Sequence, residues 1–404
     1  MEIGFYEAEN ACTKIIVVGV GGGGCNSVNR MIQAGVKGVE FIAVNTDKQA
    51  LNHCKATKKL VIGEALTGGR GAGAVPEVGE KAALEDEGII KENLKGANLV
   101  FITAGMGGGT GTGAAPVIAK IAKDLGCLTV AVVTKPFDFE KTVKGKLAAE
   151  GIEKLEKIVD TLIVISNQAL ITNCSDKITL MDAWRLADDV LKQGVQGISD
   201  LIINSGEMNI DFADVQTVMK SKGKALMGIG YGKGENAAIE AVTMAIENPL
   251  MPELIVDKAK AILVNVSGSS NLSFKTYTDV MNFIQNIASD DALVIPGQTF
   301  DDTLEDKIKV TIIATGFQDA ERVVLKPEVE VKQEVAKETE KQPVNSSAKR
   351  NDIYSTAEFL ELININKNHD DRSSHEEPAY LRELNKKNKL NTTYDFLTKK
   401  DSGF

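Results

Sequence analysis

Two glycine-rich runs constrain this chain more than any other feature: GVGGGGCN at residues 19–26 and GMGGGTGTGAAP at residues 105–116. Each run directly follows a β-branched apolar stretch and precedes a helical pattern. Glycine is costly to order, so a run of it indicates that something must approach the backbone closely. Backbone N–H groups at the start of a helix attract anions, and without a Cβ phosphate oxygens can reach them. Two such runs on strands of one sheet predict a phosphate-binding site rather than two tight turns.

The first half of the chain alternates short apolar runs with helical patterns such as residues 112–126. The apolar runs are nearly continuous, as in strands that are covered on both faces. They lie at residues 14–20, 39–44, 98–104, 128–134 and 161–166. This order predicts a doubly wound, mostly parallel α/β sheet, whose ligands lie at the carboxyl ends of the strands.

A long amphipathic stretch at residues 180–203 has apolar residues near helical spacing, and a helix of this length can link two domains. Beyond it the pattern changes to helices followed by strands, which predicts a smaller α+β domain. The expected helices span residues 235–247 and 272–288, and the expected strands span residues 259–268, 291–297 and 307–316.

Glycine is distributed unevenly, because only Gly403 of the 37 glycines lies after Phe317. Residues 328–351 have the charge-mixed composition of a disordered linker. We therefore expect a folded body that ends near Phe317 and a disordered tail after it. The expected division is a flexible N-terminus (1–12), an α/β nucleotide-binding domain (13–180), a central helix (181–204), a C-terminal α+β domain (205–317), a linker (318–375) and a partner-binding tail (376–404).

The composition excludes several classes of protein. The net charge of −10 makes nucleic acid a poor partner. The acidic start is not expected to act as a signal peptide, and without a run of about 18 apolar residues no membrane-spanning helix is expected. Scattered cysteines without a CxxC pair indicate buried thiols in a reducing compartment, so we expect a cytoplasmic protein. The five are Cys12, Cys25, Cys54, Cys127 and Cys174.

The first glycine run offers an alternative, because Gly19, Gly21 and Gly24 form a complete GxGxxG. Asp47 lies about where a ribose-binding acid would fall, so this run alone favours a dinucleotide-dependent dehydrogenase. Such a fold needs one glycine loop and not two, and His53 is the only histidine of the folded body. No metal-ligand cluster replaces that histidine, and a Walker P-loop is excluded because no GxxxxGK precedes Ser or Thr.

GMGGGTGTG at residues 105–113 resembles the signature loop of the tubulin/FtsZ superfamily, and the resemblance to the FtsZ family runs from about residue 12 to residue 317 and resumes in the tail. It implies a GTP-hydrolysing cytoskeletal protein of bacterial cell division. Its expected ligands are GTP or GDP, Mg²⁺ bound with the nucleotide, and K⁺. The resemblance further implies head-to-tail polymerisation into the division (Z) ring, in the cytoplasm near the inner face of the membrane.

The resemblance assigns phosphate-binding roles to four segments. The first run corresponds to the first phosphate loop, NTD at 45–47 to the second, and GGRGAGA at 68–74 to the third, which in the family closes over the γ-phosphate. N–H groups of the signature loop, with two threonine hydroxyls, should hold the terminal phosphates, and Thr110 is also expected to cap a helix. The implied residues are Gly22, Gly23, Gly24, Cys25, Asn26, Asn45, Asp47, Gly71, Ala72, Gly73, Gly108, Gly109, Thr110, Gly111 and Thr112.

The resemblance also implies where the nucleoside binds. Glu140 is placed to accept a hydrogen bond from a ribose hydroxyl, and Lys144 stands where the family often has Arg, which is expected to change affinity modestly. Asn167 is expected to bond the guanine. Trp184 stands where the family commonly stacks Phe on the base, although core packing would also explain it. Asp188, in place of an Asn, or its neighbour Asp189 would accept from guanine N1–H and N2–H₂ and so select GTP over ATP.

NIDFADV at residues 209–215 carries the expected catalytic residues Asn209, Asp211 and Asp214. The simpler interpretation is a helix cap made by Asn209 or Asp211. The resemblance favours another role, because the long helix would carry this loop away from the phosphate loops of its own subunit. The carboxylates would then polarise water at the nucleotide of the next subunit in a filament.

EEPAYLREL at residues 376–384 is an apolar patch in a polar tail, and chance alone could produce it. It resembles the family's peptide for membrane-tethering partners such as FtsA, which would bind it as a short helix in a groove. The implied residues are Pro378, Ala379, Tyr380, Leu381 and Arg382.

Overall fold

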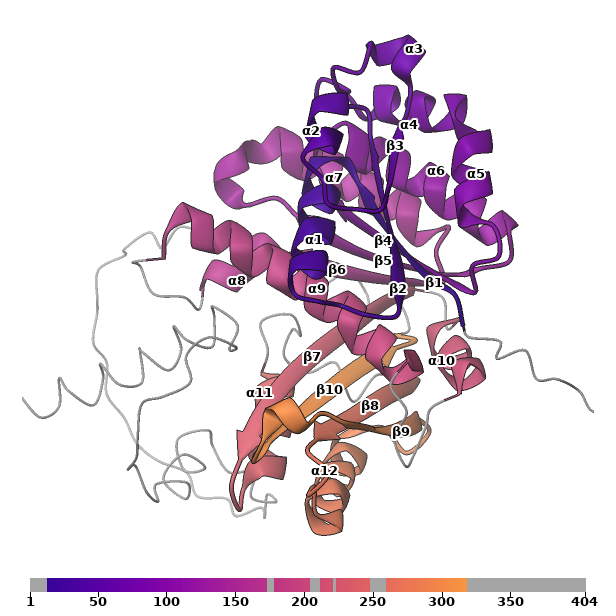
Figure 1. The fold of residues 1–404 in the computed structure, drawn as a ribbon. Helices are drawn as coiled ribbons and strands as arrows, with labels where there is room; N and C mark the ends of the chain where they lie inside the picture. Colours follow the sequence, from indigo (N-terminus) through magenta and orange to yellow (C-terminus); the bar gives the residue numbers. More distant parts are fainter. Residues whose placement is uncertain (1–12, 173–177, 204–210, 221–222, 248–258, 318–404) are drawn as a thin grey trace, which may run out of the picture. The chain divides into compact units, whose positions relative to one another are not determined.

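In the computed structural model, the residues described are 13–172, 178–203, 211–220, 223–247 and 259–317, and all of them fall within one of the two compact units of the chain. Their strands form a ten-stranded sheet in the order β3-β2-β1-β4-β5-β6-β7-β10-β8-β9 (Figure 1). The strands are β1 (Ile15–Val20), β2 (Val39–Asn45), β3 (Lys58–Val61), β4 (Leu99–Gly105), β5 (Leu128–Lys135), β6 (Thr161–Ser166), β7 (Gly223–Lys233), β8 (Ala261–Gly268), β9 (Leu293–Phe300) and β10 (Lys307–Thr315).

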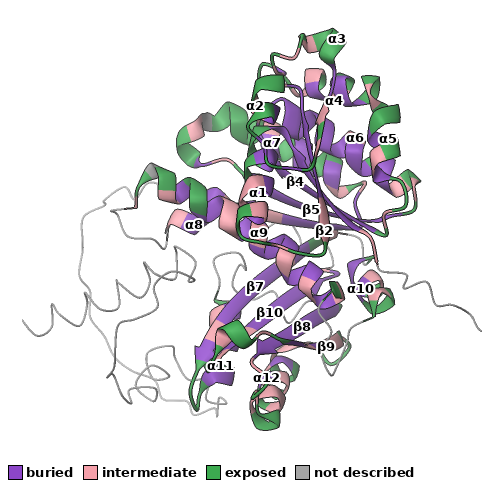
Figure 2. Ribbon diagram, viewed as in Figure 1, coloured by how far each residue is buried: buried purple, intermediate pink, exposed green. Residues whose placement is uncertain are grey.

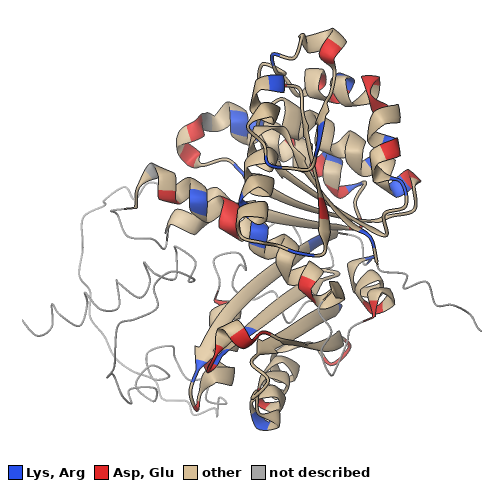
Figure 3. Cartoon of the chain, viewed as in Figure 1, with Lys and Arg blue, Asp and Glu red and all other residues tan. Residues whose placement is uncertain are grey.

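Six parallel strands, β3 to β6 in this order, form the N-terminal half of the sheet. Their side chains alternate between two apolar cores, as on β1, where Ile15 and Val17 face one core and Ile16 and Val18 face the other. The strands are therefore buried on both faces, which Figure 2 shows as purple arrows between helices. Charge lies on the helices and at strand ends, and β1, β4 and β6 carry none (Figure 3). The doubly wound α/β fold expected from the sequence is confirmed.

Helices cover the two faces of this half separately. The first core contains side chains of α1 (Gly21–Gln33), α2 (Lys48–Asn52), α8 (Asn167–Thr172), α9 (Leu180–Ile203) and α10 (Phe212–Met219). The second contains side chains of α4 (Pro76–Glu85), α5 (Glu87–Leu94), α6 (Thr110–Asp124) and α7 (Lys141–Glu156). Two short helices, α3 (Glu64–Thr67) and η1 (Asp138–Glu140), lie in the connections.

The C-terminal half is the expected α+β arrangement. β10 lies between β7 and β8 and is antiparallel to both, whereas β9 is parallel to β8. Helices α11 (Ala237–Ile246) and α12 (Phe274–Ile287) pack on one face in a third apolar core, and η3 (Asp302–Leu304) follows β9. A short parallel pairing of Thr161–Ile163 with residues 223–225 joins the two halves of the sheet.

The expected strands and helices agree with the observed ones to within two or three residues, and α9 begins and ends where residues 180–203 predict it. Two strands were not foreseen. β3 is short, half-buried and begins with two lysines, and β7 has the glycine-rich sequence GKALMGIGYGK. The domain boundaries themselves stay predictions, and the N-terminus, linker and tail lie outside the described residues.

Candidate functional site

The two glycine runs meet at the carboxyl ends of adjacent parallel strands. β1 pairs with β4 along its whole length, so the residues that follow each strand are neighbours. Gly21 begins α1 with φ of +71°, and a Cβ placed on it would lie 2.9 Å from the backbone N of Gly111. A Cβ on Gly23 would lie 3.2 Å from the N of Gly105. Glycine is required here because backbone lies directly against backbone.

The third expected loop closes on the same edge. Gly71, Gly73 and Ala74 all have positive φ, and a Cβ on Gly109 would lie 2.8 Å from the Cβ of Ala72. The N–H of Gly71 donates to the carbonyl of Thr46 at 3.1 Å, so this loop is tied to the end of β2. Backbone from four connections therefore converges at one end of the sheet, where N–H groups can surround an anion.

Polar side chains at the end of β2 and just after it shape the carboxyl edge of the sheet. Asp47 is the N-cap of α2, and its Oδ1 accepts from the N–H groups of Gln49 and Ala50 at 2.9 and 3.0 Å. Asn45, buried at the last position of β2, accepts from the N–H of Asp47 at 3.3 Å. The two residues lie beside the glycine runs, and their phosphate-binding role stays a prediction.

The two threonines of the signature loop have partners inside the protein. The hydroxyls of Thr110 and Thr46 are 2.7 Å apart, and the Oγ1 of Thr112 accepts from the N–H of Gly107 at 2.8 Å. The expectation that Thr110 caps α6 is wrong. Gly109 holds the N-cap position, no side chain caps the helix, and the Thr110 hydroxyl instead links β4–α6 to β2–α2. Thr46 is part of the predicted second phosphate loop, but its contact with Thr110 was not foreseen, because the two residues are 64 positions apart.

The expected sugar-binding residues lie together beside the signature loop. Glu140 accepts from the N–H of Phe137 at 3.0 Å and forms an ion pair with Lys144 at 2.9 Å. The indole of Trp184 packs edge-on against Phe137 with ring centroids 5.0 Å apart, yet 39% of Trp184 stays exposed. This exposure favours a stacking surface over core packing for Trp184.

Asn167 carries the most direct sign of a missing partner. It follows β6 as the first residue of α8, it is only 3% exposed, and its Oδ1 has no hydrogen-bond partner among the described residues. A buried amide oxygen without a partner is costly, so a ligand that donates to it is favoured. Guanine has such donors, and the glycine backbone nearby suits the phosphates, so the residues present fit a guanine nucleotide.

Asp188 on α9 is bonded to α1 rather than left open. Its Oδ2 accepts from Arg30 Nε at 2.5 Å and its Oδ1 accepts from the Ser27 hydroxyl at 3.0 Å. Burial raises the pKa of Asp188, while the bonds from Arg30 and Ser27 act in the opposite direction. Sequence reasoning did not find Ser27 and Arg30, since the only signal was one cation and one hydroxyl a helical turn apart on α1.

Comparison with known proteins identifies the family. The model of the GTPase domain of the tubulin/FtsZ family matches residues 14–175, and that of the FtsZ C-terminal domain matches residues 223–318. The solved structure of an empty FtsZ dimer from M. jannaschii is 42% identical with a TM-score of 0.72, over 77% of this chain and 90% of that one. The chain belongs to the FtsZ family.

Further structures agree with this assignment. A tryptophan-to-tyrosine variant of M. jannaschii FtsZ is 43% identical with a TM-score of 0.71, over 76% of this chain and 91% of that one. CetZ2 from Haloferax volcanii, solved as a protofilament bound to GTPγS, is 21% identical with a TM-score of 0.65 over 77% and 95%, which shows the fold alone. This FtsZ-family protein is therefore a GTPase that binds GTP and GDP, and the dehydrogenase alternative is discarded.

In this FtsZ-family chain the long helix α9 runs from one edge of the sheet to the other. Near its start, Trp184 contacts Phe137 beyond the carboxyl end of β5. At its end, Ile203 lies against Gly38, just before β2 begins, since a Cβ on Gly38 would lie 2.5 Å from Ile203 Cδ1. A helix of 24 residues is about 36 Å long. The chain after α9 thus starts at the edge opposite the glycine runs.

Two of the expected catalytic residues lie beyond that helix. Asp211 holds the N-cap position of α10, but its side chain makes no capping bond, and Asp214 is in the first turn. Both are exposed. The last turn of α10 is bonded to Thr161, whose hydroxyl donates to the carbonyl of Met219 at 2.5 Å, at the amino end of β6. Asn209 lies outside the described residues, as do the tail residues 378–382.

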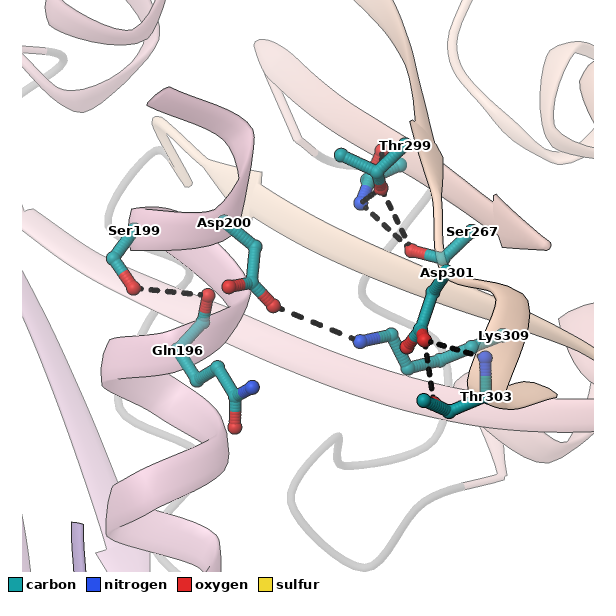
Figure 4. Close-up of polar contacts among 9 residues, drawn as sticks. Gln196, Ser199, Asp200, Ser267, Thr299, Asp301, Thr303 and Lys309 are labelled. Carbon is teal, nitrogen blue, oxygen red and sulfur yellow. Dashed lines mark hydrogen bonds and ion pairs between the residues drawn. The ribbon is translucent and has the colours of Figure 1, made fainter. Parts of the chain in front are cut away.

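A cavity of about 510 Å³ lies at this opposite edge, between the α1–β2 turn, α9 and strands β8 to β10. Asp200 Oδ2 and Lys309 Nζ are 3.8 Å apart across it (Figure 4). On its sheet side, Ser267 and Thr299 bond to each other and to the buried amide of Asn265. The cavity is therefore walled by both halves of the fold and is separate from the nucleotide edge.

No helix of the described residues is both long and apolar enough to cross a lipid bilayer. Within the same residues, no group of three or more His, Cys, Asp or Glu is arranged to hold a metal ion.

Proposed function

We propose that this GTPase polymerises head-to-tail and that each subunit supplies Asp211 and Asp214 to the nucleotide of its neighbour. The observation that carries the proposal is the placement of these aspartates. They follow a helix of 24 residues that begins at the nucleotide edge and ends at the opposite edge, so they are too far from their own phosphates to act there. A contact that joins opposite ends of identical subunits does not close on itself, so it builds filaments.

The chemistry divides between the two subunits. Backbone N–H groups of the glycine runs hold the phosphates in one subunit, and Asn167 Oδ1 accepts from the guanine. Asp211 and Asp214 of the other subunit, with Asn209, orient and polarise the attacking water for in-line displacement. Mg²⁺ carried by the triphosphate, together with K⁺, would neutralise charge on the phosphates, which are hard oxygen ligands. No protein cluster is needed for that metal, since the nucleotide brings its own ligands.

The concentration dependence of hydrolysis tests this proposal. Phosphate release from GTP is measured across a range of protein concentrations, with light scattering as a parallel record of assembly. The specific activity should be close to zero below a threshold concentration and rise with scattering above it. A specific activity that is the same at every concentration would show that the site is complete within one subunit.

The tail supplies the second part of the proposed function. We propose that Pro378, Ala379, Tyr380, Leu381 and Arg382 bind a membrane-tethering division protein of the FtsA kind, so that the filaments form the division ring at the inner face of the cytoplasmic membrane. The support is the motif EEPAYLREL in an otherwise polar tail. Deletion of residues 376–404 should abolish binding to such a partner and leave GTP hydrolysis intact. Loss of hydrolysis in the deletion variant would contradict the division between folded body and tail.

A further inference from the structure

Two buried cysteines of the α1 face lie in contact beneath the phosphate edge. Cys25 is on α1 between Gly24 and Asn26, and Cys54 follows α2. The Cys54 thiol donates to the carbonyl oxygen of Cys25 at 3.8 Å, so its sulfur lies directly against the Cys25 residue. Both are free thiols inside the same apolar core. We propose that Cys25 and Cys54 form a reversible disulfide when the protein meets a small peroxide, and that this bond slows GTP hydrolysis.

The surroundings of Cys54 favour the reactive thiolate. The hydrogen bond from Cys25 lowers the pKa of the Cys54 thiol, and the backbone N–H of Ala56 and the charge of Lys59 act in the same direction, whereas burial opposes them. The same contact raises the pKa of Cys25, as does its burial. Of the two sulfurs, Cys54 is thus the one whose thiolate is favoured, and Cys25 lies beside it to resolve the product. Cys54 is therefore the sulfur that reacts first.

The reaction needs only hydrogen peroxide. The Cys54 thiolate attacks one peroxide oxygen, the O–O bond breaks, and the departing hydroxide takes up a proton to become water. The resulting Cys54 sulfenic acid is attacked by Cys25, an S–S bond forms, and a second water leaves with the thiol proton. In total, two thiols are oxidised to one disulfide and one peroxide is reduced to two waters. The pair is close enough for this because the N–H of Lys55 donates to Asn29 Oδ1 at 2.6 Å and fastens the loop to α1.

The bond would act on the nucleotide edge through α2. Helix α1 cannot move toward Cys54, because Gly24 is packed against the backbone of β4. The loop of Cys54 must close the gap instead, since a disulfide holds its sulfurs about 2.05 Å apart. That loop ends the short helix whose N-cap is Asp47, beside the phosphate edge. Oxidation therefore displaces one wall of the nucleotide site.

Cys127 provides the matched control. It is also buried, and its thiol donates to the carbonyl of Ala97 at 3.2 Å, in a different apolar core from Cys25 and Cys54. Burial raises the pKa of Cys127, so its reactive form is disfavoured. The variants Cys54→Ser and Cys127→Ser thus differ in whether the proposed pair survives.

The experiment treats the full-length protein with hydrogen peroxide, blocks remaining thiols, maps linked peptides by mass spectrometry and measures GTP hydrolysis. Wild type and Cys127→Ser should give a Cys25–Cys54 peptide and lose about tenfold in rate, since a displacement of about 1 Å at a positioned site can cost up to 100-fold. A thiol reductant should restore the rate. Cys54→Ser should retain its rate in peroxide. Absence of the linked peptide from wild type, or an equal loss of rate in Cys54→Ser, would overturn the proposal.

Discussion

Arg30 Nε donates to Asp188 Oδ2 at 2.5 Å and so joins the helix that follows the first glycine run to the long central helix. The Asp188 side chain is only 15% exposed, and Ser27 bonds its other oxygen. In the family, the position of Asp188 is expected to face guanine. The ion pair shows that the same carboxylate also joins α1 to α9, so a change at either residue affects the contact between these two helices.

Removal of Arg30 should therefore destabilise the fold in a pH-dependent way. In Arg30→Ala, Asp188 keeps its burial and loses its cation, at a cost of about 2 kcal/mol near neutral pH. Burial already raises the pKa of Asp188 above its usual value, and loss of Arg30 raises it further. The loss in the free energy of unfolding is thus largest above that pKa, where the carboxylate is charged. It shrinks as pH falls and the carboxyl takes up a proton. Thermal unfolding of both proteins between pH 5 and pH 8 measures it.

Arg185→Ala is the control for this prediction. Arg185 is on α9, the helix that carries Asp188, and its ion pair with Asp182 is largely exposed to solvent. Its loss should change the free energy of unfolding by no more than about 0.5 kcal/mol at any pH. A difference between wild type and Arg30→Ala that stays constant across the pH range would show that packing, rather than the unpaired carboxylate, causes the loss.

Glycines of the α4–α6 contact should tolerate no side chain. A Cβ on Gly113 would lie 2.7 Å from the N of Glu80 and closer still to the carbonyl oxygen of Pro76, so Gly113→Ala must separate the helices. We expect a loss of about 2 to 3 kcal/mol. Gly88→Ala is the control, because Gly88 is in a helix and nothing lies within 4 Å of its Cβ position. That variant should gain up to about 1 kcal/mol. Urea unfolding of the two variants compares them directly, and equal stabilities would contradict the close packing.

The sequence predicted the parts of the fold whose local pattern and tertiary role agree. Continuous apolar runs become strands because both faces of the sheet are covered. β7 was missed because Gly228, Gly230 and Gly232 interrupt its pattern. Two of these glycines are required by packing, since a Cβ on Gly230 or Gly232 would overlap the backbone of α11. The edge strand β3 begins with two lysines and has little to bury. Contacts such as Arg30 with Asp188 could not be predicted, because residues 158 positions apart leave no mark on a single sequence.

The buried hydrogen-bond network of Asn265, Ser267 and Thr299 beside the cavity should stabilise the fold. The Oγ1 of Thr299 accepts from Asn265 Nδ2 at 2.8 Å and lies 2.8 Å from the Ser267 hydroxyl (Figure 4). Thr299→Val keeps the shape and leaves the Asn265 amide short of a partner, which should cost about 1 to 3 kcal/mol. Thr278→Val, at a partly exposed position of α12, should cost less than about 0.5 kcal/mol. Chemical unfolding measures both values, and equal losses would mean that the buried network adds nothing.

Trp184 offers a direct test of base stacking, because it is the only tryptophan of the chain. If guanine stacks on its exposed face, GTP should quench its fluorescence in a saturable way, and the midpoint should equal the affinity measured by dialysis. Trp184→Phe should keep GTP binding within about threefold, whereas Trp184→Ala should weaken it by about 1 kcal/mol or more. If GTP does not change the fluorescence and Trp184→Ala binds GTP with unchanged affinity, Trp184 serves only to pack against Phe137.

Asp214→Ala should separate assembly from hydrolysis. The side chain is exposed in the first turn of α10, so its loss should leave the fold and GTP binding intact. Filaments should still form on addition of GTP and Mg²⁺, but phosphate release should fall by a factor of at least about 100, since the group that orients water is gone. Gln216→Ala on the same helix should hydrolyse GTP like wild type. A mixing experiment tests the shared site. A subunit that carries Asp214→Ala and also cannot bind GTP can inhibit GTP hydrolysis by the wild-type protein only if both enter the same filaments. Unchanged hydrolysis in Asp214→Ala would remove this residue from the reaction.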